Sequence, residues 1–149
     1  MLDVAYEAVD DLPPGRLARI DEDRGWVRVR VDANVPLADV VRQLNIEVAD
    51  LLSSARWFQL WDDEILCGDT PGRALRVEYL LSPEIPPEMG VGMAEDKGII
   101  RIHICPTLEV ADFVAWMNPA TKTQLDAGHW FQLYDGEIID NGPEPMTRV

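Results

Sequence analysis

Few side chains in this sequence are hydroxyl or thiol nucleophiles or imidazole bases. Its 149 residues include three Ser, two His and two Cys, and no Gly-x-Ser-x-Gly turn exposes a nucleophile. His103 and Cys105 lie two residues apart, which puts both side chains on one face of a strand, and Cys67 could join them as a third metal ligand. A solvent-facing His beside a small apolar Cys is the commoner arrangement. We therefore expect no metal and no cofactor.

Paired carboxylates are the other candidates for chemistry. Asp62 with Glu64, and Asp135 with Glu137, lie at predicted turns. Such pairs carry out acid–base catalysis only where one carboxyl group is buried, and the tips of hairpins are usually exposed. The sequence therefore favours a protein that is not an enzyme. A small enzyme with a carboxylate-based site is the remaining alternative.

Two aromatic segments supply the candidate binding residues. Each contains Trp-Phe-Gln-Leu and then Trp or Tyr, and each continues into a two-residue turn, Asp62-Asp63 or Asp135-Gly136, which predicts a β-hairpin. With this turn Leu60 pairs with Ile65, and alternate residues of each strand point to opposite faces. One face then carries the candidate binding residues Trp57, Gln59, Trp61, Trp130, Gln132 and Tyr134.

That face has two interpretations. In the first it packs against the other of the two similar units that contain these segments, with the Gln side chains meeting across the junction, because such units must cover one another. In the second it is an exposed platform for a partner protein, since Trp and Tyr dominate binding energies at interfaces. A narrower form of the second is a small-molecule or carbohydrate site, in which a sugar ring stacks on Trp and bonds to Gln.

The elements that hold these segments are repeated along the chain. Laying each residue over the one 73 positions later gives about 21 identities in about 76 overlaid positions, where chance gives roughly 5. The matches include those of Tyr6 with Tyr79 and of Asn45 with Asn118. We infer a tandem duplication and predict two units, residues 1–73 and 74–149, which fold separately or as one compact domain.

Hydrophobic patterns predict the same strands in both units. An opening strand, residues 2–9 and 75–81, ends at a Pro-Pro pair, because proline has no N–H to donate to a sheet. A loop and an acidic turn that ends in Gly come next. Alternation of Val or Ile with other residues over 27–31 and 100–104 then predicts a half-buried strand.

Two short helices are predicted next in each unit. They span residues 35–44 and 45–53, and then 108–117 and 118–127. Asn34 and Thr107 would cap the first helix of each pair, and Asn118-Pro119 would start the last helix. With the aromatic hairpins, these elements predict an α+β fold. We expect a mainly antiparallel sheet with short helices packed on one face, and an approximate two-fold axis between the units.

Charge and composition limit the choice of partner. The chain has 13 Lys and Arg against 27 Asp and Glu, a net charge of -14, which repels nucleic-acid phosphates. No apolar stretch approaches the roughly 20 residues of a membrane helix, and the two cysteines lie at non-equivalent places in the units. We therefore expect a cytoplasmic protein that binds neither nucleic acid nor membrane directly.

Small size, acidity, aromatic hairpins and missing catalytic groups together favour a non-enzymatic protein-binding module. An inhibitor, immunity or anti-defence protein acting on a basic target protein has this character. A small-molecule or carbohydrate-binding module is the alternative. The sequence predicts no oligomeric state.

Overall fold

Two three-stranded sheets carry the alternating Val and Ile residues. The computed structural model describes residues 2–54, 56–68 and 74–140. The first sheet has the order β1 (Asp3–Val9), β3 (Trp26–Asp32), β2 (Ala18–Asp23), and the second has the order β6 (Arg76–Leu81), β8 (Ile99–Ile104), β7 (Val91–Asp96). In each sheet the central strand pairs antiparallel with its hairpin neighbour and parallel with the opening strand. The predicted α+β class is confirmed, with mostly antiparallel pairing.

The acidic turns predicted before the central strands are also confirmed. Arg24 and Gly25 join β2 to β3 with φ angles of 49° and 85°, and Lys97 and Gly98 join β7 to β8 with φ angles of 46° and 84°. Two successive positive φ angles define the tight turn that suits the twist of a hairpin.

Each half contains one continuous helix, so the prediction of two short helices per unit was wrong. The helices are α1 (Leu37–Leu52) and α2 (Val110–Ala127). The residues before them are Pro36 and Glu109, and neither helix start has a side-chain cap, so Asn34 and Thr107 do not cap. Pro119 lies inside α2 and is exposed, so the carbonyl group that it leaves without a helical N–H can be solvated.

Asn118 does not start a helix because its side chain is bonded elsewhere. Its Oδ1 accepts the backbone N–H of Tyr6 at 2.7 Å, and its Nδ2 donates to the Tyr6 carbonyl oxygen at 3.0 Å. Asn45 makes the same two bonds, at 2.7 and 3.0 Å, to the backbone of Tyr79. Each helix thus satisfies polar groups on the open edge of a strand from the other half.

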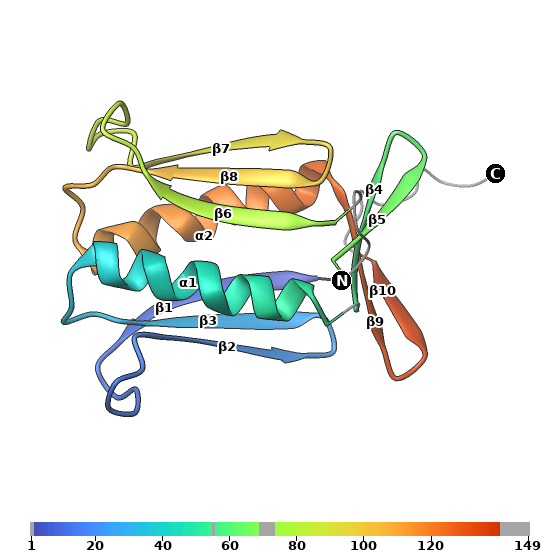
Figure 1. Ribbon diagram of the computed structural model, residues 1–149, viewed down its shortest axis with the longest axis horizontal. Coiled ribbons are helices and arrows are strands. Elements are labelled where there is room, and N and C mark those ends of the chain that lie inside the picture. The colour runs from blue at the N-terminus through green and yellow to red at the C-terminus, as the bar shows by residue number, and fades with distance from the viewer. Residues whose placement is uncertain (1, 55, 69–73, 141–149) are drawn as a thin grey trace.

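The helices run along sheet edges, an arrangement that the sequence did not predict. Helix α1 packs against β6 and β2, and α2 packs against β1 and β7. Sheets and helices therefore alternate around a shared core, with one sheet above and one below the helices in Figure 1. No helix in the described part of the chain is both long and apolar enough to cross a membrane.

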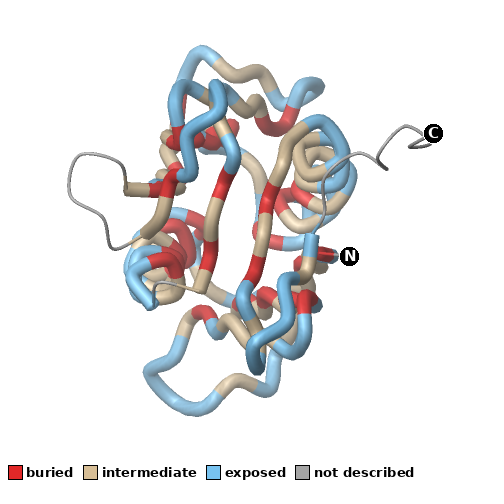
Figure 2. The backbone as a smooth tube through the Cα atoms, turned by 90° about the vertical axis from the view of Figure 1, so that its right-hand side faces the viewer, coloured by how far each residue is buried: buried red, intermediate tan, exposed pale blue. Residues whose placement is uncertain are grey.

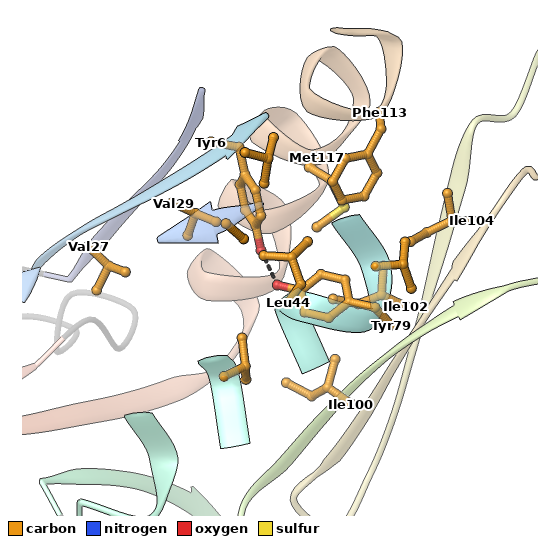
Figure 3. Packing of buried hydrophobic residues seen from close by; sticks show 14 of the residues in the cluster. Tyr6, Val27, Val29, Leu44, Tyr79, Ile100, Ile102, Ile104, Phe113 and Met117 are labelled. Atoms are coloured by element: carbon orange, nitrogen blue, oxygen red, sulfur yellow. Dashed lines mark hydrogen bonds between the residues drawn. The ribbon is translucent and has the colours of Figure 1, made fainter. Parts of the chain in front are cut away.

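Two tyrosines meet inside this core. The hydroxyl oxygens of Tyr6 and Tyr79 lie 2.6 Å apart, and both rings contact Phe113 edge-on, at centroid distances of 6.2 and 6.5 Å. Figure 3 shows the two phenols between the Val side chains of β3 and the Ile side chains of β8. Burial raises the pKa of both phenols, that of Tyr79 well above its usual value. Both side chains therefore stay neutral in the folded protein at neutral pH.

A third, four-stranded sheet lies across one end of the molecule. Its order is β10 (Glu137–Asp140), β9 (His129–Tyr134), β4 (Trp57–Trp61), β5 (Glu64–Cys67). Strands β4 and β9 pair antiparallel, which joins the two aromatic hairpins into one sheet. Figure 1 shows this sheet beside the two others, and Figure 2 views the molecule from that end.

The predicted hairpins and their register are confirmed. Leu60 pairs with Ile65, and Leu133 pairs with Ile138. The turn residues Asp62-Asp63 and Asp135-Gly136 all have positive φ, from 47° to 79°. The described elements of each half follow the same order, namely three strands, a helix and two strands. The predicted boundary between residues 73 and 74 adjoins residues 69–73, which lie outside the described residues.

Candidate binding surface

The six predicted binding residues all point into the molecule or lie at the margin of its core. Trp57, Gln59, Trp130 and Gln132 are buried, each with at most 6% of its surface exposed. Trp61 and Tyr134 are half-buried. The structure brings these residues together on the inner face of the four-stranded sheet. An exposed platform of Trp57 and Trp130, as the carbohydrate alternative requires, is absent from this part of the described chain.

Gln132 and Glu22 form the centre of one hydrogen-bonded cluster on that inner face. Gln132 Nε2 donates to Glu22 Oε2 at 2.8 Å, and Gln132 Oε1 accepts the N–H of Gly25 at 2.8 Å. The indole N–H of Trp57 donates to the same carboxylate oxygen at 3.1 Å, and Arg56 forms an ion pair with Glu22. The Glu22 carboxylate, with a side chain 10% exposed, thus accepts two hydrogen bonds and has one cationic partner.

Glu95 forms the corresponding cluster with fewer partners. Gln59 Nε2 donates to Glu95 Oε1 at 2.8 Å, and the amide of Gln124 bonds to the other carboxylate oxygen. Gln59 Oε1 and Trp130 Nε1 are buried and have no hydrogen-bond partner among the described residues. The Glu95 cluster therefore leaves two buried polar groups of the four-stranded sheet unpaired, whereas Gln132 and Trp57 of the Glu22 cluster are both bonded.

Sequence reasoning missed the role of these two acids. It assigned Glu22 and Glu95 to the acidic turns, but Glu22 lies in β2 and Glu95 in β7, and both carboxylates bond to side chains on the inner face of the four-stranded sheet. One signal was available: Glu22 with Glu95, and Gln59 with Gln132, are identical pairs 73 residues apart. A carboxylate accepts the hydrogen bonds that an amide N–H donates, so the repeat of both types indicated a possible pair.

The opposite side of the same sheet is apolar and faces solvent. We call it the outer face and define it by Phe58, Leu60, Ile65, Phe131, Leu133 and Ile138. Ile138 and Ile65 are 71% and 62% exposed, and Leu133 and Leu60 are 41% and 37% exposed. Phe58 and Phe131, both half-buried, are register partners across β4 and β9, so they connect the two hairpins into one continuous patch.

Acidic residues surround the outer face at the hairpin ends. The exposed acids are Asp62, Asp63 and Glu64 on one hairpin and Asp135, Glu137 and Asp140 on the other. Arg24 approaches Glu137 to 3.0 Å in an exposed ion pair, which salt screens and which neutralises one of these charges. The paired carboxylates considered for acid–base catalysis lie at these tips, where water surrounds them.

His103 and the cysteines do not form a metal site in the described part of the chain. His103 Nδ1 lies 2.7 Å from Ser82 Oγ, and Cys105 Sγ lies 3.2 Å from Thr107 Oγ1. No three His, Cys, Asp or Glu side chains among the described residues are grouped as metal ligands. The Ser82–His103 pair also lacks, among the described residues, a carboxylate that bonds the other ring nitrogen. It therefore supplies the nucleophile and the base of a nucleophile–base–acid arrangement but not the acid.

No protein-family model, curated protein or solved structure matches this chain. Its function is therefore inferred from the chemistry and exposure of its own residues.

Proposed function

We propose that the protein is a non-enzymatic binding module that docks on a basic partner protein through the outer face. The observation that carries this proposal is the continuous run of exposed and half-buried apolar side chains over all four strands of one sheet. Isolated apolar residues are common on protein surfaces, but contiguous patches are typical of interaction sites. Ile65 and Ile138 are the most exposed large apolar side chains of the described residues and lie on the two outer strands of this patch.

Charge identifies the chemistry of the partner. The acids at the hairpin ends flank the apolar outer face, and the whole chain carries a net charge of -14. A complementary surface has an apolar centre with Lys or Arg around it, because such charges are attracted during approach and paired after docking. A second copy of this chain would instead bring acids against acids. A nucleic acid would meet the same repulsion from its phosphates.

This chemistry fits an inhibitor, immunity or anti-defence protein whose target has a cationic surface. Such a protein needs only to cover the target, and it requires no catalytic group of its own. The proposal includes a cytoplasmic location, which is supported by the buried Cys105 thiol, as in proteins of reducing compartments.

The proposal is tested with variants of the outer face and a matched control. Ile65→Glu combined with Ile138→Glu places two charges in the patch, whereas Ile46→Glu alters a 52% exposed Ile on α1, outside the outer face. Partners captured from host lysate by the tagged protein are quantified at low and high salt for all three proteins. We expect a basic partner that high salt weakens, that the double variant loses and that Ile46→Glu retains.

Three results would contradict this proposal. One is a partner that the double variant retains, and another is the absence of any partner at either salt concentration. The third is concentration-dependent dimerisation of the wild type that the double variant abolishes, measured by light scattering. That result would assign the outer face to a second copy of this chain.

A further inference from the structure

An apolar cavity of about 130 Å³, partly open to the surface, lies beneath the four-stranded sheet. Trp57 and Trp130 of that sheet form part of its wall, and the rings of Tyr6 and Tyr79 line it as well. The remaining wall comes from all six strands of the two three-stranded sheets and from both helices. Figure 3 shows the Val side chains of β3 on one side of the tyrosine pair and the Ile side chains of β8 on the other.

The cavity offers little to a water molecule. The phenol oxygens of Tyr6 and Tyr79 bond to each other, and the side-chain amide of Gln124 bonds to Glu95. Among the lining residues, Thr121 Oγ1 and Trp130 Nε1 are buried without a hydrogen-bond partner among the described residues. A buried water usually needs two to four polar partners, whereas large cavities lined by aliphatic and aromatic groups stay dry and accept apolar guests.

We propose that this cavity is a binding site for a small, uncharged, mainly apolar molecule about the size of one aromatic ring. An engineered apolar cavity of about 150 Å³ in another protein binds benzene or xenon, and the volume here is close to that value. Thr121 can form one hydrogen bond with a guest, so a ring that carries a single hydroxyl group also fits. A charged guest does not fit, because no lining residue could pair with its charge.

This site is separate from the proposed docking surface. The inner face of the four-stranded sheet contributes Trp57 and Trp130 to the cavity, and the outer face contributes none of its six residues. The double variant Ile65→Glu/Ile138→Glu should therefore bind the same small molecules as the wild type does. The two proposals can fail independently of each other.

Direct binding is measured by titrating the wild-type protein with benzene, toluene and phenol, and with benzoate and glucose as charged and polar comparisons. Indole N–H signals in two-dimensional NMR spectra report on Trp57 and Trp130, and the melting temperature reports on binding to the folded state. We expect saturable shifts and a raised melting temperature with the first three probes and neither effect with benzoate or glucose.

Matched changes on the central strands of the two three-stranded sheets locate the site. Val29→Ile adds one methylene to the cavity wall, and Ile100→Val removes one. Ile104→Val makes the same removal on β8 at a fully buried residue that does not line the cavity. One methylene in an apolar pocket changes affinity by roughly tenfold or more. We expect Val29→Ile to weaken toluene binding about that much, Ile100→Val to strengthen it, and Ile104→Val to leave it unchanged.

Two outcomes would overturn the proposal. The first is the absence of saturable binding by benzene, toluene and phenol to the wild type. The second is binding that Val29→Ile and Ile100→Val leave unaltered, which would place the probes elsewhere. If Val29→Ile does not fold, the comparison of Ile100→Val with Ile104→Val decides the question, because both variants lose the same group from the same strand.

Discussion

Glu22 and Glu95 occupy matching positions, yet they are bonded to different sets of groups. Glu22 receives hydrogen bonds from Gln132 and Trp57 and pairs with Arg56. Glu95 receives hydrogen bonds from two amides and has no cationic partner among its described contacts. The same backbone arrangement therefore holds one carboxylate with a positive charge and the other with neutral donors only.

Two sequence differences account for this contrast. The position of Arg56 in the first half is occupied by His129 in the second, and the His129 ring packs edge-on against Phe131. The position of Leu51 is occupied by Gln124, whose amide takes the place of the missing cation at Glu95. Trp130 Nε1 is left without a partner, although Trp57 Nε1 has one. The shared backbone thus fixes where an inward-facing acid lies, whereas the neighbouring side chains decide how many hydrogen bonds and ion pairs it forms.

The largest expected loss of unfolding free energy comes from removing the Asn side-chain bonds that the two halves share. Asn45→Ala and Asn118→Ala each leave one backbone N–H and one carbonyl group without their partner. We expect each variant to lower the free energy of unfolding by about 2–4 kcal/mol, after a small gain in helix propensity from Ala. Urea denaturation measures both losses, with exposed Arg42→Ala on α1 as the control. Losses that differ by more than about 1 kcal/mol would show that the halves differ here too.

The next effect tests the clusters in which the halves differ. Gln132→Leu removes an acceptor from Gly25 and a donor from Glu22, whereas Gln59→Leu removes only a donor from Glu95. We expect losses of about 2–4 and about 1–2 kcal/mol in the free energy of unfolding, because each buried group left unpaired adds its own desolvation cost. Both variants replace a buried amide with an apolar side chain of similar size. Equal losses would contradict the contrast between the two clusters.

A smaller effect is expected at the contact between the two tyrosines. Tyr6→Phe or Tyr79→Phe alone removes one hydroxyl group and leaves the other buried, which should cost about 1–2 kcal/mol of unfolding free energy. The double variant removes both hydroxyl groups and should cost clearly less than the sum of the single losses. Thermal and urea unfolding of the four proteins form a double-mutant cycle. Additive losses would mean that the two hydroxyl groups are not coupled.

The smallest expected effect is a change in how the unfolding free energy depends on pH, and it is measurable only at alkaline pH. Burial raises the pKa of Tyr6 and Tyr79 above the ordinary value of 10.0. The unfolded chain then releases these protons at a lower pH than the folded protein does. The stabilising contribution is complete below pH 10 and is lost as the pH rises through the folded-state values. We expect the unfolding free energy to decline above pH 10, and to decline less steeply in the Tyr6→Phe/Tyr79→Phe variant.

Local patterns were sufficient to predict β1, β3, β6, β8 and the aromatic hairpins, whereas β2 and β7 lie where a loop was predicted. Alternating Val and Ile located β3 and β8, and two-residue turns such as Asp135-Gly136 set the register of the aromatic hairpins. These features depend on residues that are close together in the sequence. The helix start predicted at Asn118-Pro119 used equally good local signals, but the side chain of Asn118 is bonded to Tyr6, and α2 continues through it. A distant partner outweighed the local preference.

The candidate surface was only partly predictable for a related reason. The sequence identified the two faces of each hairpin, but both faces are apolar, so alternation alone could not tell which one is buried. The buried face is the one whose Gln59 and Gln132 reach Glu95 and Glu22, and those bonds connect residues far apart in the chain. The outer face, with Leu60 and Leu133, is therefore exposed because these long-range bonds bury the opposite face.

The exchange of helices between the halves has a consequence for synthesis on the ribosome. Strand β1 is made early, but the Asn118 that bonds its edge at Tyr6 follows 112 residues later. Until α2 has emerged, β1 presents unpaired backbone groups that can pair with other chains. Closing a contact of this length is slow compared with forming a local hairpin or helix. We therefore expect the nascent first half to remain unfinished and vulnerable to aggregation, and the whole chain to reach its native state in one late, cooperative step.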